Sequence, residues 1–186
     1  MSSENATVEA EVPPSRSSFW LLMLLTVCVA VGFAFWLRMK SATNVGGLDV
    51  GQPLPALNAS GWLQGEPPTS ESLDGEVLLI HAWFPECVFC FREAPELVKL
   101  QREYGDRVKF IGLTFRDVDQ LDSIEGFLEA TGIDWLNGYG ALDTLRAFDA
   151  EYFPTIWVIG RDGTVVWNKD ESESLVDGIE RALAQK

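Results

Sequence analysis

Beyond residue 76 the hydrophobic and polar positions fall into two alternating patterns. Short apolar runs rich in β-formers are typical of strands, and the run at 77–82 is nearly continuous, as in a sheet covered on both faces. Longer segments between the runs carry apolar residues at helical spacing. The predicted strands are 77–82, 108–113, 133–136, 155–159 and 164–167, and the predicted helices are 90–104, 123–130, 141–148 and 171–184. Strands that alternate with helices predict an α/β domain in which helices flank a central sheet.

The first 37 residues follow a different pattern. Residues 1–18 are rich in Ser, Glu and Pro and predict a disordered tail. Residues 19–37 are uncharged and have aromatic pairs at both ends, and at about 1.5 Å per residue they nearly span the roughly 30 Å hydrocarbon core of a bilayer. We therefore predict a transmembrane helix at 19–37. A cleaved signal peptide is the alternative, but its apolar region is usually shorter and precedes small residues, whereas Arg38 follows here. Cys28, inside the run, is interpreted as a lipid-facing or packing residue.

The rest of the chain is interpreted as a linker at 38–47 and one globular domain at 48–186, with a lead-in rich in Gly and Pro at 41–70. The whole chain holds 28 acidic and 14 basic residues without a basic stripe, so nucleic acid is not expected as a partner. The acidic excess is interpreted as an aid to solubility. Arg16 precedes the apolar run, and Arg38 and Lys40 follow it, so the positive-inside rule taken literally places the domain in the cytoplasm.

Two cysteines lie where the first predicted strand gives way to a helix. Cys87 is near the start of that helix, where unpaired N–H groups and the helix dipole favour a thiolate, so it is the predicted nucleophile. Cys90, one turn further on, is the predicted resolving thiol. A zinc site needs four ligands, and only His81 and Cys28 remain to complete one, so no metal is expected. Buried cysteines that merely pack are the other alternative, which leaves their position between strand and helix unexplained.

The segment 81–95 resembles the active site of the TlpA/ResA-like membrane-anchored thiol:disulfide oxidoreductases of the thioredoxin superfamily. The residues that fall on positions typical of this family are Trp83, Cys87, Cys90, Glu93 and Pro95. The resemblance covers about 48–186. It implies a thioredoxin-like fold with a central mixed sheet, an N-terminal hairpin in the lead-in, and no cofactor beyond a redox-active disulfide between the two cysteines. Glu86 departs from the family, which has Trp there, and so does the pair Val88-Phe89.

The resemblance also assigns residues to the binding of a partner chain. Pro154 matches a proline that in the family has a cis peptide bond, lies against the cysteines and has neighbouring backbone that pairs with a substrate. Phe153 and Thr155 flank this proline and share the predicted role, and Trp83 and Glu86 are predicted to contribute from the cysteine side. The sequence alone indicates only a proline at the start of a strand, where its missing N–H is tolerated.

Two titratable residues are candidates for handling the proton of Cys90. Glu93 is one helical turn beyond Cys90 and matches a glutamate that the family uses near its cysteines; the alternative is a solvated helix residue. His81 is the only histidine and occupies the position of a buried acid in thioredoxin proper. A histidine accepts a proton near neutral pH. The alternative for His81 is a core residue with satisfied hydrogen bonds.

These residues predict an enzyme of thiol–disulfide exchange with protein disulfides or dithiols, in which the Cys87 thiolate attacks and Cys90 resolves the mixed disulfide. Negative charge from Glu86 disfavours the thiolate of Cys87 and indicates a reductant. The resemblance further implies a donor of electrons in the membrane, a role in cytochrome c maturation, and a periplasmic domain on a bacterial cytoplasmic membrane, against the literal charge count. Three alternatives stay open: a non-catalytic binding module, a peroxide-reducing relative and a copper carrier. Against the last two, Phe84 replaces the Thr of a peroxiredoxin, and the spacing is not CxxxC.

Overall fold

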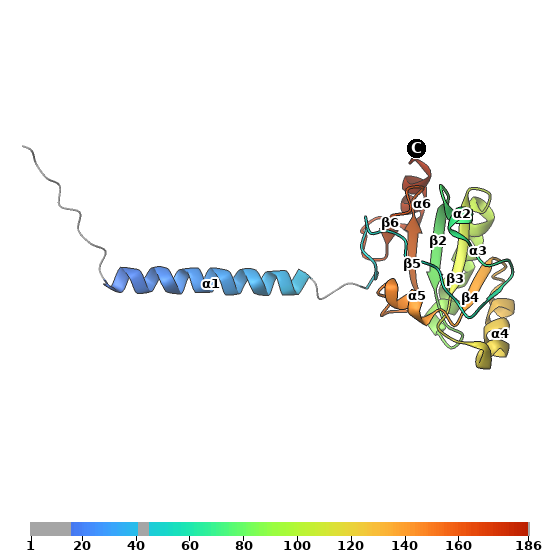
Figure 1. The fold of residues 1–186 in the computed structure, drawn as a ribbon, viewed down its shortest axis with the longest axis horizontal. Helices are drawn as coiled ribbons and strands as arrows, with labels where there is room; N and C mark the ends of the chain where they lie inside the picture. The colour runs from blue at the N-terminus through green and yellow to red at the C-terminus, as the bar shows by residue number, and fades with distance from the viewer. Residues whose placement is uncertain (1–15, 41–44, 186) are drawn as a thin grey trace, which may run out of the picture. The chain divides into compact units, whose positions relative to one another are not determined.

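The computed structural model describes residues 16–40 and 45–185, and contacts divide the chain into the units Met1–Thr43 and Asn44–Lys186 (Figure 1). In the first unit, helix α1 covers Arg16–Lys40 and so includes the last three residues of the predicted tail. Residues 1–15 of that tail and 41–44 of the predicted linker lie outside the described residues. Within the described part of the chain, no helix combines the length and the apolar character needed to cross a membrane.

The second unit is built on a mixed sheet of six strands in the order β1-β4-β3-β2-β5-β6, and the predicted central mixed sheet is thus confirmed. The strands are β1 (Gly61–Leu63), β2 (Val77–Ala82), β3 (Val108–Leu113), β4 (Leu136–Tyr139), β5 (Thr155–Ile159) and β6 (Val165–Asn168). Strands β2, β3 and β4 are parallel, whereas β5 runs antiparallel to β2, β6 to β5, and β1 to β4.

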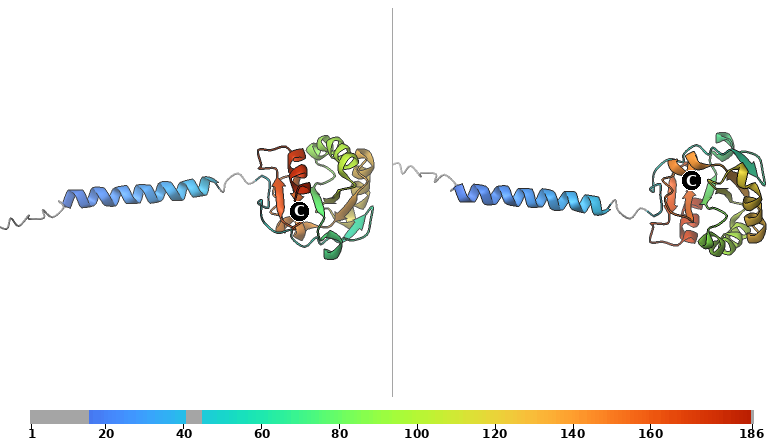
Figure 2. Two further views of the ribbon diagram at one scale, coloured as in Figure 1. Left: turned by 90° about the horizontal axis from the view of Figure 1, so that it is seen from above. Right: turned by 90° about the horizontal axis from the view of Figure 1, so that it is seen from below.

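Helices cover both faces of this sheet, as the end-on views in Figure 2 show. The helices are α2 (Ser70–Leu73), α3 (Val88–Tyr104), the short 3-10 helix η1 (Val118–Gln120), α4 (Leu121–Thr131), α5 (Leu142–Ala147) and α6 (Leu175–Leu183). Alternate residues of β2 enter two different apolar cores. Val77 and Leu79 pack with α3, α4 and α6, and Leu78 and Ile80 pack with α5 and the lead-in. Burial on both faces explains why this strand is a continuous apolar run.

Several predicted boundaries are wrong for identifiable reasons. The predicted strand 133–136 is instead β4 at Leu136–Tyr139, because Ile133 and Trp135 are buried in the core ahead of the strand. The last helix begins at Leu175 and not at 171, because Ser174 caps it in a reciprocal pair of hydrogen bonds with Asp177.

The hairpin predicted for the lead-in is also wrong within the part of it that the structure describes. The lead-in strand β1 pairs with β4, and Pro53 forms an isolated bridge with Thr164. Both of these partners are remote in sequence, so the lead-in wraps along the edges of the sheet. The local Gly and Pro pattern carries no signal for such long-range pairing.

Candidate active site

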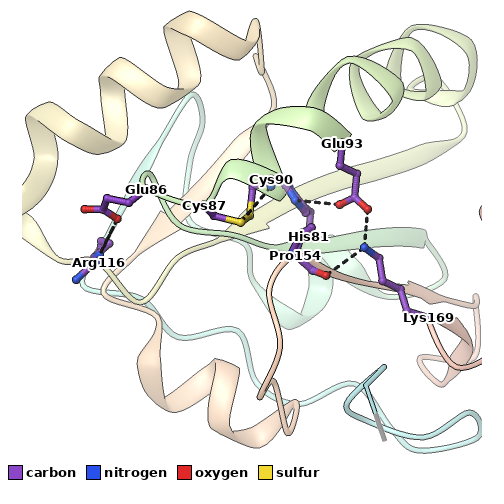
Figure 3. The surroundings of a disulfide bond; sticks show 8 residues. All are labelled: His81, Glu86, Cys87, Cys90, Glu93, Arg116, Pro154 and Lys169. Atoms are coloured by element: carbon purple, nitrogen blue, oxygen red, sulfur yellow. Dashed lines mark hydrogen bonds and ion pairs between the residues drawn. A yellow bond between two sulfur atoms is a disulfide. The ribbon is translucent and has the colours of Figure 1, made fainter. Parts of the chain in front are cut away.

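The two cysteines of the motif form a disulfide, Cys87–Cys90, at the start of α3 (Figure 3). Cys87 is the N-cap of the helix, and its Sγ accepts a hydrogen bond of 3.0 Å from the backbone N–H of Cys90. Because Cys87 caps the helix, α3 begins at Val88, two residues before the predicted start. The residue Cys87 is 5% exposed and Cys90 is 0% exposed, so only Cys87 presents surface to an incoming thiol or disulfide.

Pro154 follows a cis peptide bond with Phe153, in agreement with the expectation from the family resemblance. The proline immediately precedes β5, which pairs with β2 so that Thr155 lies opposite Ala82. The loop before β5 and the loop after β2 therefore emerge at the same end of the sheet. This register brings the cis-proline to the end of the sheet at which the cysteines lie.

Three phenylalanines from three different loops form a cluster at this end of the sheet. The ring centroids of Phe84, Phe115 and Phe153 are 5.5 to 5.6 Å apart in each pair. The cluster adjoins the disulfide, because the backbone N–H of Cys87 donates to the carbonyl of Phe84 at 3.1 Å. Phe153 is therefore partly buried directly before the cis-proline, with its ring packed against the other two.

Glu86 is not the isolated negative charge that the sequence suggests. Its carboxylate pairs with the guanidinium of Arg116 at 3.1 Å, and the guanidinium also lies over the ring of Phe115 at 5.0 Å. The side chains of Glu86 and Arg116 are 52% and 30% exposed, so solvent weakens the pair without removing the compensation of charge. The prediction that Glu86 disfavours the Cys87 thiolate is therefore corrected, because Arg116, from the loop after β3, compensates the charge of Glu86.

Trp83 and Thr155 were expected to contact a partner chain, but both are 0% exposed. The Trp83 ring stacks on Phe127 of α4 at 4.3 Å, and its Nε1–H donates to Oδ1 of Asn137 at 3.0 Å. The structure therefore does not present either side chain to a surface partner, and the predicted pairing of a partner with the backbone beside Pro154 stays a prediction. Trp83 instead follows β2 directly and is buried in the same apolar core as the two cysteines.

Behind the cysteines lies a second group of charged and polar side chains, which we call the His81 cluster: His81, Glu93 and Lys169 (Figure 3). The Nε2 atom of His81 is 3.7 Å from Oε2 of Glu93, whose other oxygen, Oε1, is 2.5 Å from Nζ of Lys169. The same Nζ donates to the carbonyl oxygen of Pro154 at 3.1 Å. The cluster thus joins β2, α3, the residue after β6 and the cis-proline loop.

His81 is neutral in this arrangement. The 3.7 Å contact with Glu93 is an ion pair only if the ring is protonated, and it is too long for a hydrogen bond. Complete burial, and then the positive charge of Lys169, lower the pKa of His81 from its ordinary 6.5 to about 3. Because Lys169 already balances Glu93, a second positive charge is disfavoured. The expectation that His81 accepts protons near neutral pH is therefore corrected.

Three residues that matter here were missed in the sequence: Arg116, Asn137 and Lys169. Each comes from a segment remote from the CxxC motif, and a single basic or amide residue near a strand end carries no local signal. Among the residues that the structure describes, no group of three His, Cys, Asp or Glu side chains is arranged to hold a metal ion.

Comparison with known proteins agrees with this arrangement. The thioredoxin-like protein YneN of Bacillus subtilis is 23% identical over 152 residues, which are 78% of this chain and 86% of that protein. The thiol-disulfide oxidoreductase ResA of Halalkalibacterium halodurans is 25% identical over 158 residues, 81% of this chain and 85% of that protein. The solved thioredoxin domain of a thiol-disulfide oxidoreductase from Bacteroides vulgatus matches with a TM-score of 0.62 at 21% identity, over 72% of this chain and 97% of that domain, and it shows the thioredoxin-like fold.

A thioredoxin-like fold with a CxxC disulfide at the start of a helix and a cis-proline beside it defines the thiol–disulfide oxidoreductases, and this protein is an enzyme of that class. The chain belongs to the Redoxin family, whose sequence profile matches residues 49–183.

Proposed function

We propose that this protein is a membrane-anchored oxidoreductase that reduces disulfides in protein partners. The observation that carries the exchange chemistry is the Cys87–Cys90 disulfide at the start of α3, in which Cys87, at 5%, is the more exposed of the two cysteines. In the reduced enzyme the Cys87 thiolate attacks a partner disulfide, one partner sulfur leaves as a thiolate, and a mixed disulfide forms. Cys90, as a thiolate, then attacks Cys87, and the second partner sulfur leaves with its electron pair.

A protein partner is supported by the surface next to Cys87. Val88 and Phe89 follow Cys87 directly and are 60% and 64% exposed, and Tyr152, before the cis-proline loop, is 54% exposed. A partner sulfur must reach Cys87 to react, so the chain that carries it covers these side chains. Burial of exposed apolar area at this point favours a macromolecule over a peroxide.

The proposed direction, reduction of the partner, rests on the resemblance to the TlpA/ResA-like proteins. Glu86 no longer supports this direction, because Arg116 balances its charge. On the same resemblance, we propose that a membrane protein supplies the electrons and that cytochrome c maturation is the process served. The equilibrium of the Cys87–Cys90 pair with glutathione tests the direction, and a potential above that of glutathione would contradict it.

The proposed anchor is the uncharged run at 19–37. Within it Leu22, Leu24 and Leu25 are 61%, 62% and 64% exposed, and apolar side chains of this kind require a cover of lipid or protein. We place the catalytic domain outside the cytoplasm, on the periplasmic side of a bacterial cytoplasmic membrane. Fusion of alkaline phosphatase to the C-terminus is expected to give activity. An active cytoplasmic reporter at the same position would instead support the literal charge count.

Reduction of insulin by the purified full chain tests the chemistry. Cys87→Ser is expected to abolish turnover, because it removes the nucleophile, and Cys90→Ser is expected to accumulate mixed disulfides that no internal thiol resolves. Cys28→Ser is the matched control, because Cys28 is a free cysteine in the other unit, and it is expected to leave turnover unchanged. Full activity of Cys87→Ser would overturn the assignment.

A further inference from the structure

Lys169 makes two contacts that connect separate parts of the site. Its Nζ is 2.5 Å from Oε1 of Glu93, on the same helix as the cysteines, and 3.1 Å from the carbonyl oxygen of Pro154, in the cis-proline loop. The side chains of Lys169 and Glu93 are only 25% and 20% exposed. Partial burial makes their attraction stronger than that of a surface pair and makes the loss of either partner more costly.

The two oxygens of Glu93 have different surroundings. Oε1 is held by Lys169, whereas Oε2 is buried and lacks a hydrogen-bond partner, and it faces Nε2 of His81 at 3.7 Å. Both ring nitrogens of His81 also lack hydrogen-bond partners. A buried carboxylate oxygen without a donor is an available proton acceptor, and Glu93 follows the buried Cys90 by three residues, about one turn of α3.

We propose that Lys169 is a positioning residue that reserves Glu93 as the proton acceptor for Cys90, by holding its carboxylate at the cis-proline loop and by keeping His81 uncharged. This inference rests on the proposed exchange function. In the resolving step the Cys90 thiol gives its proton to Glu93, and the Cys90 thiolate forms the bond to Cys87. The bond from Cys87 to the partner breaks, the partner leaves with the electron pair, and Glu93 later returns the proton to solvent.

The groups that face Glu93 come from each element packed against it. His81 faces it from β2 and Lys169 from the residue after β6, and Cys90 lies on its own helix. Among the described residues, no other charged side chain contacts the Glu93 carboxylate. Without Lys169, His81 is the remaining group able to balance Glu93. A protonated His81 would then occupy Oε2, and the acceptor would no longer be available to Cys90.

The test uses the full chain with labelled histidine, because His81 is the only histidine and gives one imidazole signal. In the wild type the signal is expected to stay constant from pH 8 down to about 5, since the pKa of His81 is about 3. Lys169→Met is expected to move the midpoint of the titration upward by about one to three pH units. Lys169→Gln, which keeps a donor but not the charge, is expected to behave like Lys169→Met, and Lys169→Arg is expected to restore the wild-type curve.

The second readout is the release of a partner thiol from a preformed mixed disulfide. At pH 7 Lys169→Met is expected to slow release at least about tenfold, since a general base contributes about 10²-fold or more, while the rate of Cys87 alkylation stays unchanged. Lys99→Met changes an exposed lysine on α3, the helix of Cys90 and Glu93; it is the control and is expected to change neither readout.

A constant histidine signal and normal release in both Lys169→Met and Lys169→Gln would overturn the proposal, and so would failure of Lys169→Arg to restore either readout. Absence of insulin reduction by the wild type would instead contradict the proposed function, while the histidine titration would still report on the effect of the Lys169 charge on His81.

Discussion

Burial of a neutral histidine makes the stability of the oxidised protein depend on pH in a predictable window. The pKa of His81 is about 3 in the folded protein, against an ordinary value of 6.5 that applies to the unfolded chain. Below pH 6.5 the unfolded chain therefore binds a proton on this residue, whereas the folded chain does not. Stability therefore falls as pH decreases from 6.5 towards 3, by at most about 1.4 kcal/mol for each pH unit. Between pH 7 and pH 5 the expected loss is about 2 kcal/mol, a large share of a typical total of roughly 5 to 15 kcal/mol.

Urea unfolding at pH 7, 6 and 5, followed by tryptophan fluorescence, measures this loss, because Trp83 and Trp157 are fully buried. The window separates His81 from the carboxyl groups. Hydrogen bonds hold the pKa of Asp162 and of Asp177 below their ordinary values, so the stability that these two groups contribute to the protein is lost only at lower pH. His81→Gln carries a neutral side chain at every pH, and the loss between pH 7 and pH 5 is expected to be absent from it.

The difference in pH dependence between the wild type and His81→Gln is the informative quantity, and the absolute stability of the variant is not. Equal dependence in the two proteins would refute the neutral state of His81. It would mean that the folded protein binds the proton as readily as the unfolded chain, with His81 and Glu93 as a true ion pair across 3.7 Å. Lys169 would then have to lie further from Glu93 than the structure shows.

Two further predictions concern the surroundings of the cysteines. Arg116→Met leaves Glu86 unbalanced beside Cys87 and is expected to raise the pH midpoint of Cys87 alkylation, whereas Glu86→Gln is expected to lower that midpoint. Each shift is expected to be under about one pH unit because the pair is partly exposed, and shifts of the same sign would contradict the prediction. Gly112→Ala places a methyl group against the side chain of Asn137 in the core. The variant is expected to have a free energy of unfolding lower by about 2 to 4 kcal/mol. A decrease in that free energy below about 1 kcal/mol would show that the core adapts.

Strands buried on both faces were the most predictable elements. The bounds of β2, β3 and β5 agree with the sequence to the residue, because each is a mostly apolar run, interrupted in β3 by the exposed Lys109, and such a run has few alternatives. The start of α3 was predicted two residues late. Cys87 itself serves as the N-cap, a role that sequence patterns assign to Ser, Thr, Asp or Asn.

The edge of the sheet and the partners of the charges were not predictable in this way. Strand β1 is three residues long and is stabilised by its pairing with β4. The residues that determine β1 as a strand therefore lie about 75 residues further along the chain. Lys169 follows β6 and reaches Glu93 across 76 positions, and Arg116 reaches Glu86 across 30. Contacts of this range depend on the completed fold, and a residue pattern confined to the motif does not contain them.

Both carboxylates of the motif therefore act differently from what their place in the sequence suggests. Glu86 and Glu93 lie one residue before and three residues after the two cysteines, and each would disfavour a thiolate if unbalanced. Each instead receives one cation from a loop at the end of a strand, Arg116 on the exposed side and Lys169 on the buried side. With both charges balanced, the helix N-terminus is the dominant fixed influence on Cys87. The more exposed pair, Glu86 and Arg116, is weakened by salt, whereas the partly buried pair, Glu93 and Lys169, is screened less. Added salt should therefore leave the resolving step nearly unchanged, while the reactivity of Cys87 responds only weakly, through the exposed pair and the helix terminus.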